Sequence, residues 1–239
     1  MPTKIKNQLP SSMIRVKLKA ENRPVLVSFS LGKDAIATEL ALADEGIETV
    51  LAYMYLIPPD SKGKHLSFVQ DSLDKLEKQL GKRIHTYPHP SLYRWLNGFV
   101  MQPPERLAVI QAAEFPPLDY PTLWELIKED LGLPADTWVA DGVRAADSIV
   151  RRASLSRHGV MKPSSRKVSP IADWLKAEVL DCIESHGIDL PVDYELFGRS
   201  FDGLDYRFLK PIKDNLPQDY ERILEWFPLV EMEILRNEL

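Results

Sequence analysis

The sequence predicts an α/β protein with a doubly wound, mostly parallel sheet and a helical C-terminal extension. Short apolar runs alternate with amphipathic segments over residues 25–87, which is the β-α-β-α-β order of a parallel sheet. A further apolar run at 137–140 leads directly into a polar turn, as strands of such sheets do. The 239 residues, 44% of them hydrophobic, are enough for one large domain with a small appendage.

Each element follows from its local pattern. Residues 25–30 (VLVSFS) are short, apolar and partly β-branched, and predict a buried strand. Helical spacing of apolar residues over 33–45, with Gly46 after it, predicts a helix and its end. The same criteria predict strands over 49–57, 83–87 and 137–140, and helices over 65–80, 121–131, 171–186, 218–227 and 229–236.

Charge and cysteine content narrow the class of function. The net charge of −5 argues against a protein that binds nucleic acid over its whole surface. Residues 144–167 nevertheless carry +6, which favours a local phosphate site, with an exposed basic loop as the alternative. The one cysteine, Cys182, excludes an internal disulfide and any all-cysteine metal site. We therefore expect no iron–sulfur cluster and no structural zinc.

The hydropathy pattern bears on location. No apolar run approaches the roughly 18 residues that a membrane helix needs. The first twenty residues contain no continuous hydrophobic stretch. We expect a soluble, cytoplasmic protein without membrane contact.

The segment after the first strand has the composition of a phosphate loop. It reads Ser30-Leu31-Gly32-Lys33-Asp34-Ala35 and runs into a helix, whose free N–H groups and positive end favour an anion. Gly32 permits close approach, and Ser30 and Lys33 offer a hydroxyl and a charge. It is not a Walker A loop, because Val27 stands where that motif needs glycine. An ordinary strand-to-helix turn is the alternative.

A second polar segment follows the fourth strand. It runs from Asp141 through Arg144 to Arg152. Because parallel strands end at one edge of a sheet, we expect this segment to face the Ser30–Lys33 loop and to bind a polyphosphate with it. A solvated run of arginines is the alternative. Asp34 and Asp141 are candidates to hold Mg²⁺ together with phosphate oxygens, and helix capping is the alternative for Asp34.

Three segments together resemble a known family. SLGKDA at 30–35 resembles the S-G-G-K-D-S loop of the adenine-nucleotide α-hydrolase (PP-loop) superfamily. GVRAADSIVR at 142–151 resembles the G-x-R-x-x-E-S-x-x-R segment of its phosphoadenosine phosphosulfate (PAPS) reductase branch. KVSPIADW at 167–174, followed by PVDY at 191–194, resembles the K-V-x-P-I-x-D-W and P-x-x-Y run of that branch. The segments occur in the family's order over about three quarters of the chain.

The resemblance implies a Rossmann-like fold that binds ATP or PAPS, with Mg²⁺ expected. It implies a nucleotide-binding domain over 24–203, between a basic N-terminal arm (1–23) and the helical extension (204–239). It places Lys33, Asp34, Arg144 and Arg151 in catalytic roles, the two arginines at the far phosphate or sulfate end. The nucleotide-binding residues that it implies are Ser28, Ser30, Leu31, Gly32, Lys33, Asp34, Tyr53 (near the adenine), Gly142, Arg144, Ser148 and Arg151.

The chain also departs from that pattern. Leu31 replaces a loop glycine, Ala35 replaces a serine, and Asp147 shortens the usual glutamate. The C-terminal E-C-G-L-H motif that carries the reductases' catalytic thiol is absent, and the chain ends EMEILRNEL. Cys182 lies mid-helix among acidic residues that would raise its pKa, so we interpret it as structural.

Three functions remain open. The first is cleavage of ATP between its α and β phosphates, with adenylation of an acceptor and release of pyrophosphate, in a sulfur-transfer or nucleic-acid-modification reaction. The second is a PAPS-dependent reductase or sulfotransferase that uses an external thiol. The third is a nucleotide-binding regulator without turnover. A partner protein, a nucleic-acid substrate and assembly with a second copy are left open.

Overall fold

The computed structural model describes residues 4–239, so the first three residues of the expected N-terminal arm lie outside it. The chain divides into two compact units. The first comprises Met1–Tyr53, Leu76–Thr86 and Trp124–Leu190, and the second comprises Met54–Lys75, Tyr87–Leu123 and Pro191–Leu239. The domain boundaries expected from the sequence stay a prediction. Within the described residues, no helix is both long and apolar enough to span a membrane.

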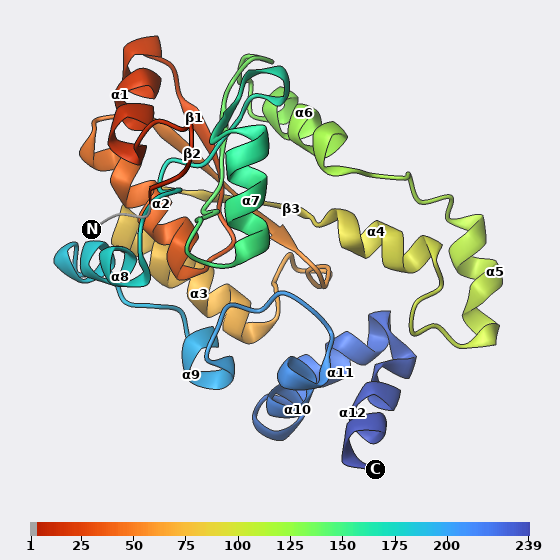
Figure 1. Cartoon of the computed structure of the whole chain (residues 1–239). Helices are drawn as coiled ribbons and strands as arrows, with labels where there is room; N and C mark the ends of the chain where they lie inside the picture. Colours follow the sequence, from red (N-terminus) through yellow and green to blue (C-terminus); the bar gives the residue numbers. More distant parts are fainter. Residues whose placement is uncertain (1–3) are drawn as a thin grey trace. The chain divides into compact units, whose positions relative to one another are not determined.

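Figure 1 shows the chain coloured along the sequence, with labels on the α-helices and on β1, β2 and β3. The strands are β1 (Val25–Ser28), β2 (Thr49–Tyr55), β3 (Ile84–Pro88), β4 (Val139–Ala140), β5 (Met161–Lys162) and β6 (Lys167–Val168). The helices are α1 (Ser11–Glu21), α2 (Lys33–Asp44), α3 (Ser67–Leu80), α4 (Pro90–Asn97), α5 (Pro104–Ala112), α6 (Tyr120–Asp130), α7 (Ile149–His158), α8 (Lys176–Ser185), α9 (Asp193–Phe197), α10 (Tyr206–Asn215), α11 (Pro217–Trp226) and α12 (Glu231–Glu238). Two 3₁₀ turns complete the set, η1 (Pro163–Ser165) and η2 (Pro228–Val230).

The sheet has the order β3-β2-β1-β4-β6-β5. β1 pairs in parallel with both β2 and β4, β4 pairs in parallel with β6, and β5 pairs with β6 antiparallel. The chain therefore builds outward from β1 in one direction through β2 and β3, and in the other through β4. This confirms the predicted α/β class with a mostly parallel sheet. It also puts the topological switch point, where ligands of such sheets bind, between β1 and β4.

The core of the first unit follows from the apolar runs. Leu26, Val27 and Leu51 are wholly buried in the two central strands, and Ile36 and Leu42 are wholly buried on α2. A strand that is buried on both faces needs a continuous apolar run, and the residues Val25, Leu26 and Val27 therefore predict this strand.

The second unit has an aromatic core of its own. Phe68, Phe197, Phe201 and Phe208 pack edge to face, with ring centroids 5.2–5.6 Å apart in the T-shaped pairs. Such geometry sets the positive ring edge against the negative ring face. Asp219 caps the start of α3 by accepting the backbone N–H and hydroxyl of Ser67.

The structure corrects the predicted bounds of two segments and adds a hairpin that was not predicted. The helix predicted over 171–186 begins only at Lys176, because 171–174 forms a turn in which buried Asp173 accepts the backbone N–H of Ser11. The polar segment Asp141–Arg152 is helical in its last part, because α7 begins after Ser148, whose hydroxyl accepts the N–H of Arg151. The β5–β6 hairpin was not predicted, because each strand has only two residues.

Candidate anion site at the β1–β4 edge

The loop after β1 turns sharply before it enters α2. Leu31 has a φ of 60°, in the left-handed region, and its side chain is buried. Gly32 follows in extended conformation as the N-terminal cap of α2, without a side-chain hydrogen bond to the cap. The helix therefore begins at this edge with its positive end uncapped by any side chain. The loop glycine of the resembled motif is replaced by leucine, but the backbone still makes the turn.

The loop after β4 lies directly against the start of α2. A Cβ added at Gly142 would lie 2.8 Å from the carbonyl carbon of Asp34, and 2.9 Å from both its Cβ and its carbonyl oxygen. No side chain fits in that space, so glycine is required where the two backbones touch. The two segments that the sequence pointed to thus meet at the switch point, as expected from parallel topology.

Five charged side chains alternate in sign across this junction. Lys33 Nζ lies 2.6 Å from one oxygen of Asp34, and Arg144 Nε lies 2.8 Å from the other. Arg144 Nη2 lies 2.6 Å from Asp147 Oδ1, and the other oxygen of Asp147, Oδ2, lies 2.6 Å from Arg151 Nη1. The ladder Lys33–Asp34–Arg144–Asp147–Arg151 holds three cations and two carboxylates, which leaves an excess of one positive charge.

The cations of the ladder differ in their access to solvent. The side chain of Arg144 is 4% exposed, and it also donates to the carbonyl oxygen of Trp174. Arg151 is 52% exposed and Lys33 is 19% exposed. Arg144 is therefore placed to position the two aspartates, whereas Arg151 and Lys33 have surface to offer an anion. The expected contact of Arg144 with a terminal phosphate stays a prediction.

Asp141 lies at the end of β4 with its carboxylate held from two sides. Its Oδ1 accepts the hydroxyl of Ser169 at 2.6 Å and the N–H of Val143 at 3.2 Å. Burial raises the pKa of Asp141, and these two hydrogen bonds oppose the rise. Asp34 has a cation at each oxygen, Lys33 at one and Arg144 at the other, and a Mg²⁺ site shared by Asp34 and Asp141 stays a prediction. Mg²⁺ would need phosphate oxygens beside them and the release of Lys33 from Asp34.

The other predicted residues occupy varied positions. Ser28 ends β1 and is half-buried, Ser30 is exposed in the loop, and Tyr53 is almost fully buried in β2. Ser148 is exposed, with its hydroxyl engaged in capping α7. Ser169 was missed as a partner of Asp141, although it stands within the K-V-S-P segment that the sequence singled out.

Cys182 lies on α8, away from the ladder. Burial raises the pKa of its thiol, the charge of Asp44 raises it further, and Arg15 opposes the rise. The side chain is thus no activated nucleophile, as expected. Asp44 ends α2, whereas Lys33 begins it, so the thiol is at the opposite end of this helix from the anion site.

Comparison with known proteins gives weak structural likenesses. No protein-family model and no curated protein matches the sequence. A PAPS reductase from Candida auris, solved as a phosphate complex, is similar in fold at 14% identity and a TM-score of 0.46, over 82% of this chain and 88% of its own. An NH3-dependent NAD synthetase from Campylobacter jejuni is similar at 14% identity and a TM-score of 0.44, over 95% and 91% of the chains. An NMN synthetase from Francisella tularensis is similar at 12% identity and a TM-score of 0.42, over 94% of each chain. The first of these is a protein of the branch whose motifs the sequence resembles. At such scores, the chemistry must be judged on this chain's own residues.

Proposed function

We propose that this chain binds an adenine nucleotide at the β1–β4 edge and cleaves ATP between its α and β phosphates. The observation that carries the proposal is the backbone contact of Gly142 with Asp34 at the switch point of the sheet. It joins the uncapped start of α2 to the loop that carries Arg144 and leads into α7, on which Arg151 lies. A polyphosphate is the ligand class that suits a helix N-terminus and two accessible cations within one junction.

The ion pairs of the ladder suggest how the phosphates enter. Lys33 and Arg151 are each paired with an aspartate, and each is accessible enough to exchange that carboxylate for a phosphate oxygen. Arg144 stays buried and keeps Asp34 and Asp147 in place during the exchange. Freed of Lys33, Asp34 could share Mg²⁺ with the phosphates, and the ion would supply further neutralisation of their charge.

The proposed step needs positioning and charge more than a covalent nucleophile. A nucleophilic atom of the acceptor attacks the α-phosphorus, the bond from this phosphorus to the bridging oxygen breaks, and pyrophosphate leaves with the electron pair. Lys33 and Arg151 stabilise the charge that develops on the leaving phosphates. No thiol of this chain takes part, which agrees with the position of Cys182 on α8.

A ligand panel tests the binding. ATP with Mg²⁺, AMP and PAPS are compared by thermal shift, since each ligand raises the melting temperature according to its affinity. ATP is expected to stabilise the protein most, and Lys33→Ala and Arg151→Ala to weaken that effect at least tenfold in Kd. Arg157→Ala, an exposed arginine further along α7, is the matched control. Unchanged ATP affinity in both site variants would contradict the proposal.

Pyrophosphate release separates the three functions. Release of pyrophosphate and AMP-linked product from ATP, lost in Lys33→Ala, supports the proposed reaction. Tighter binding of PAPS than of ATP favours PAPS chemistry with an external thiol. Tight ATP binding without release in the presence of candidate acceptors, nucleic acid included, favours a regulator instead.

A further inference from the structure

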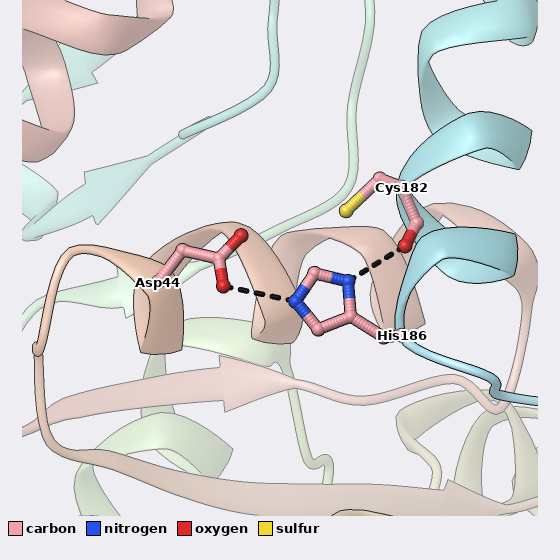
Figure 2. Close-up of side chains that lie close together, drawn as sticks. All are labelled: Asp44, Cys182 and His186. Carbon is pink, nitrogen blue, oxygen red and sulfur yellow. Dashed lines mark hydrogen bonds and ion pairs between the residues drawn. The ribbon is translucent and has the colours of Figure 1, made fainter.

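The C-terminal ends of α2 and α8, which pack against each other, bring together three side chains outside the anion site. Figure 2 shows Asp44 at the end of α2 facing Cys182 and His186 at the end of α8. One oxygen, nitrogen or sulfur atom of each residue lies within 4.8 Å of the others. They form the one group of at least three His, Cys, Asp or Glu found at such spacing among residues 4–239.

The imidazole of His186 is oriented as a metal-binding histidine is. Its Nδ1 lies 2.7 Å from the backbone carbonyl oxygen of Cys182, to which it donates a proton. Its Nε2 then faces the carboxylate of Asp44 at 2.9 Å. Ligating histidines commonly donate their second N–H to a carbonyl in this way. A lone pair on Nε2 and a carboxylate repel each other unless a proton or a metal cation lies between them.

The sequence spacing and the backbone both favour a cation here. Cys182 and His186 are four residues apart, which puts their side chains on one face of the end of α8. Asp44 is the last residue of α2 and His186 is the C-terminal cap of α8, so both side chains lie at helix C-termini. A helix C-terminus carries a partial negative charge, and two of them attract a cation more than either does alone.

The donor set selects the kind of metal. Sulfur, imidazole nitrogen and one carboxylate oxygen suit Zn²⁺, whereas Mg²⁺ and Ca²⁺ prefer oxygen alone. Zinc bonds of 2.0–2.3 Å in a tetrahedron separate ligand atoms by about 3.4–3.6 Å. The present spacing needs the Asp44–His186 pair to open by roughly half an ångström and the sulfur to approach. The exposed fractions of the Asp44 and His186 side chains, 57% and 32%, leave an entry path and room for water as a fourth ligand.

We propose that Asp44, Cys182 and His186 form a zinc site that fastens the end of α2 to the end of α8. The eleven-residue rise along α2 separates Asp44 from Lys33 by about 16 Å, so this site is distinct from the anion site. The expectation of no structural zinc rested on the cysteine count, which excludes all-cysteine sites only. This inference does not depend on the proposed nucleotide chemistry.

Metal titration of the full chain tests the site. Protein freed of metal with EDTA is titrated with Zn²⁺ by calorimetry, and in parallel with Co²⁺ by absorption spectroscopy. We expect one ion per chain, a thiolate-to-cobalt charge-transfer band, and displacement of Co²⁺ by Zn²⁺. Absence of that band would overturn the proposal, because an adventitious His–Asp contact would not engage the sulfur.

Variants decide which side chains bind. Cys182→Ser, His186→Gln and Asp44→Asn should each weaken Zn²⁺ binding at least tenfold, with Cys182→Ser also abolishing the charge-transfer band. His158→Gln, another exposed histidine at a helix C-terminus, is the matched control and should bind as the native chain does. Equal Zn²⁺ affinity in Cys182→Ser and the native chain would refute the site. Far-ultraviolet circular dichroism checks folding, and unchanged ATP binding in Cys182→Ser would show that the two sites are independent.

Discussion

Replacement of Gly142 by alanine tests the contact on which the anion site depends. The added Cβ would come within 2.8–2.9 Å of three atoms of Asp34, two of which are backbone atoms in the first turn of α2. Backbone in a helix cannot rotate away as a side-chain end can, so the loop or the helix must shift. Overpacking of this kind costs about 2–3 kcal/mol, in the upper part of its usual range. For a chain of this size, that lowers the melting temperature by roughly 4–12 °C.

The matched control is Gly203→Ala. There the added Cβ would meet Asp205 Oδ2 at 3.5 Å and Phe208 Cε2 at 4.0 Å, which is ordinary van der Waals contact. Its effect should stay within about 0.5 kcal/mol. Both variants are melted with and without ATP and Mg²⁺, and Gly142→Ala should lose most of the ATP-induced stabilisation as well. Equal melting temperatures and equal ATP responses in the two variants would show that the two loops do not meet as described.

Three further predictions each test a single feature of the structure. Leu31→Gly should be more stable than Leu31→Ala by about 1 kcal/mol in denaturant unfolding, because glycine relieves the left-handed φ of 60° whereas alanine keeps it; the reverse order would contradict the backbone assignment. Arg144→Ala should destabilise the protein by about 3 kcal/mol, because it leaves two partly buried carboxylates without their shared cation, whereas Arg151→Ala should cost less than about 0.5 kcal/mol. Similar losses in both would mean that Arg144 is no more structural than Arg151. Burial, aided by the charge of Arg94, lowers the pKa of His89 to about 4. The folded chain thus favours the neutral imidazole of His89, whereas the unfolded chain takes up a proton there below about pH 6.5. The stability that the neutral ring contributes is therefore complete above about pH 6.5 and is lost as the pH falls toward 4. The free energy of unfolding should drop by about 1 kcal/mol more between pH 7 and 5.5 in the native chain than in His89→Gln; parallel pH profiles would refute this.

The central strands and helices could be predicted from the sequence because the apolar patterns that define them lie within each element. Val25, Leu26 and Val27 form an apolar run because β1 is buried on both faces, although the strand ends at Ser28, two residues before its predicted end. Helix α2 begins and ends within a residue of its predicted bounds. The start of α8 was not readable, because the turn before it is fixed by Asp173 and Ser11, which are 162 residues apart in sequence. The helical spacing of apolar residues extended the predicted helix back to residue 171. Residues 171–173 are buried because they belong to this turn and not to the helix.

The candidate site was predicted from topology more than from its side chains. Parallel strands brought Asp34 and Gly142 together without any long-range signal in the sequence. The burial of Arg144 was missed, because an arginine within a basic stretch is normally exposed to solvent. Its partners, the carboxylates of Asp34 and Asp147 and the carbonyl oxygen of Trp174, are known only from the structure. Asp44 and His186 were missed for a similar reason, since their contact spans 142 residues.

The most direct measurement of the central claim is a crystal structure of this chain with a non-hydrolysable ATP analogue and Mg²⁺. We predict phosphate density at the start of α2, with Lys33 Nζ moved from Asp34 to a phosphate oxygen, Arg151 in contact with the phosphates, and Arg144 still buried between its aspartates. An analogue bound elsewhere, or a Lys33–Asp34 pair unchanged beside an empty loop at saturating analogue, would contradict it.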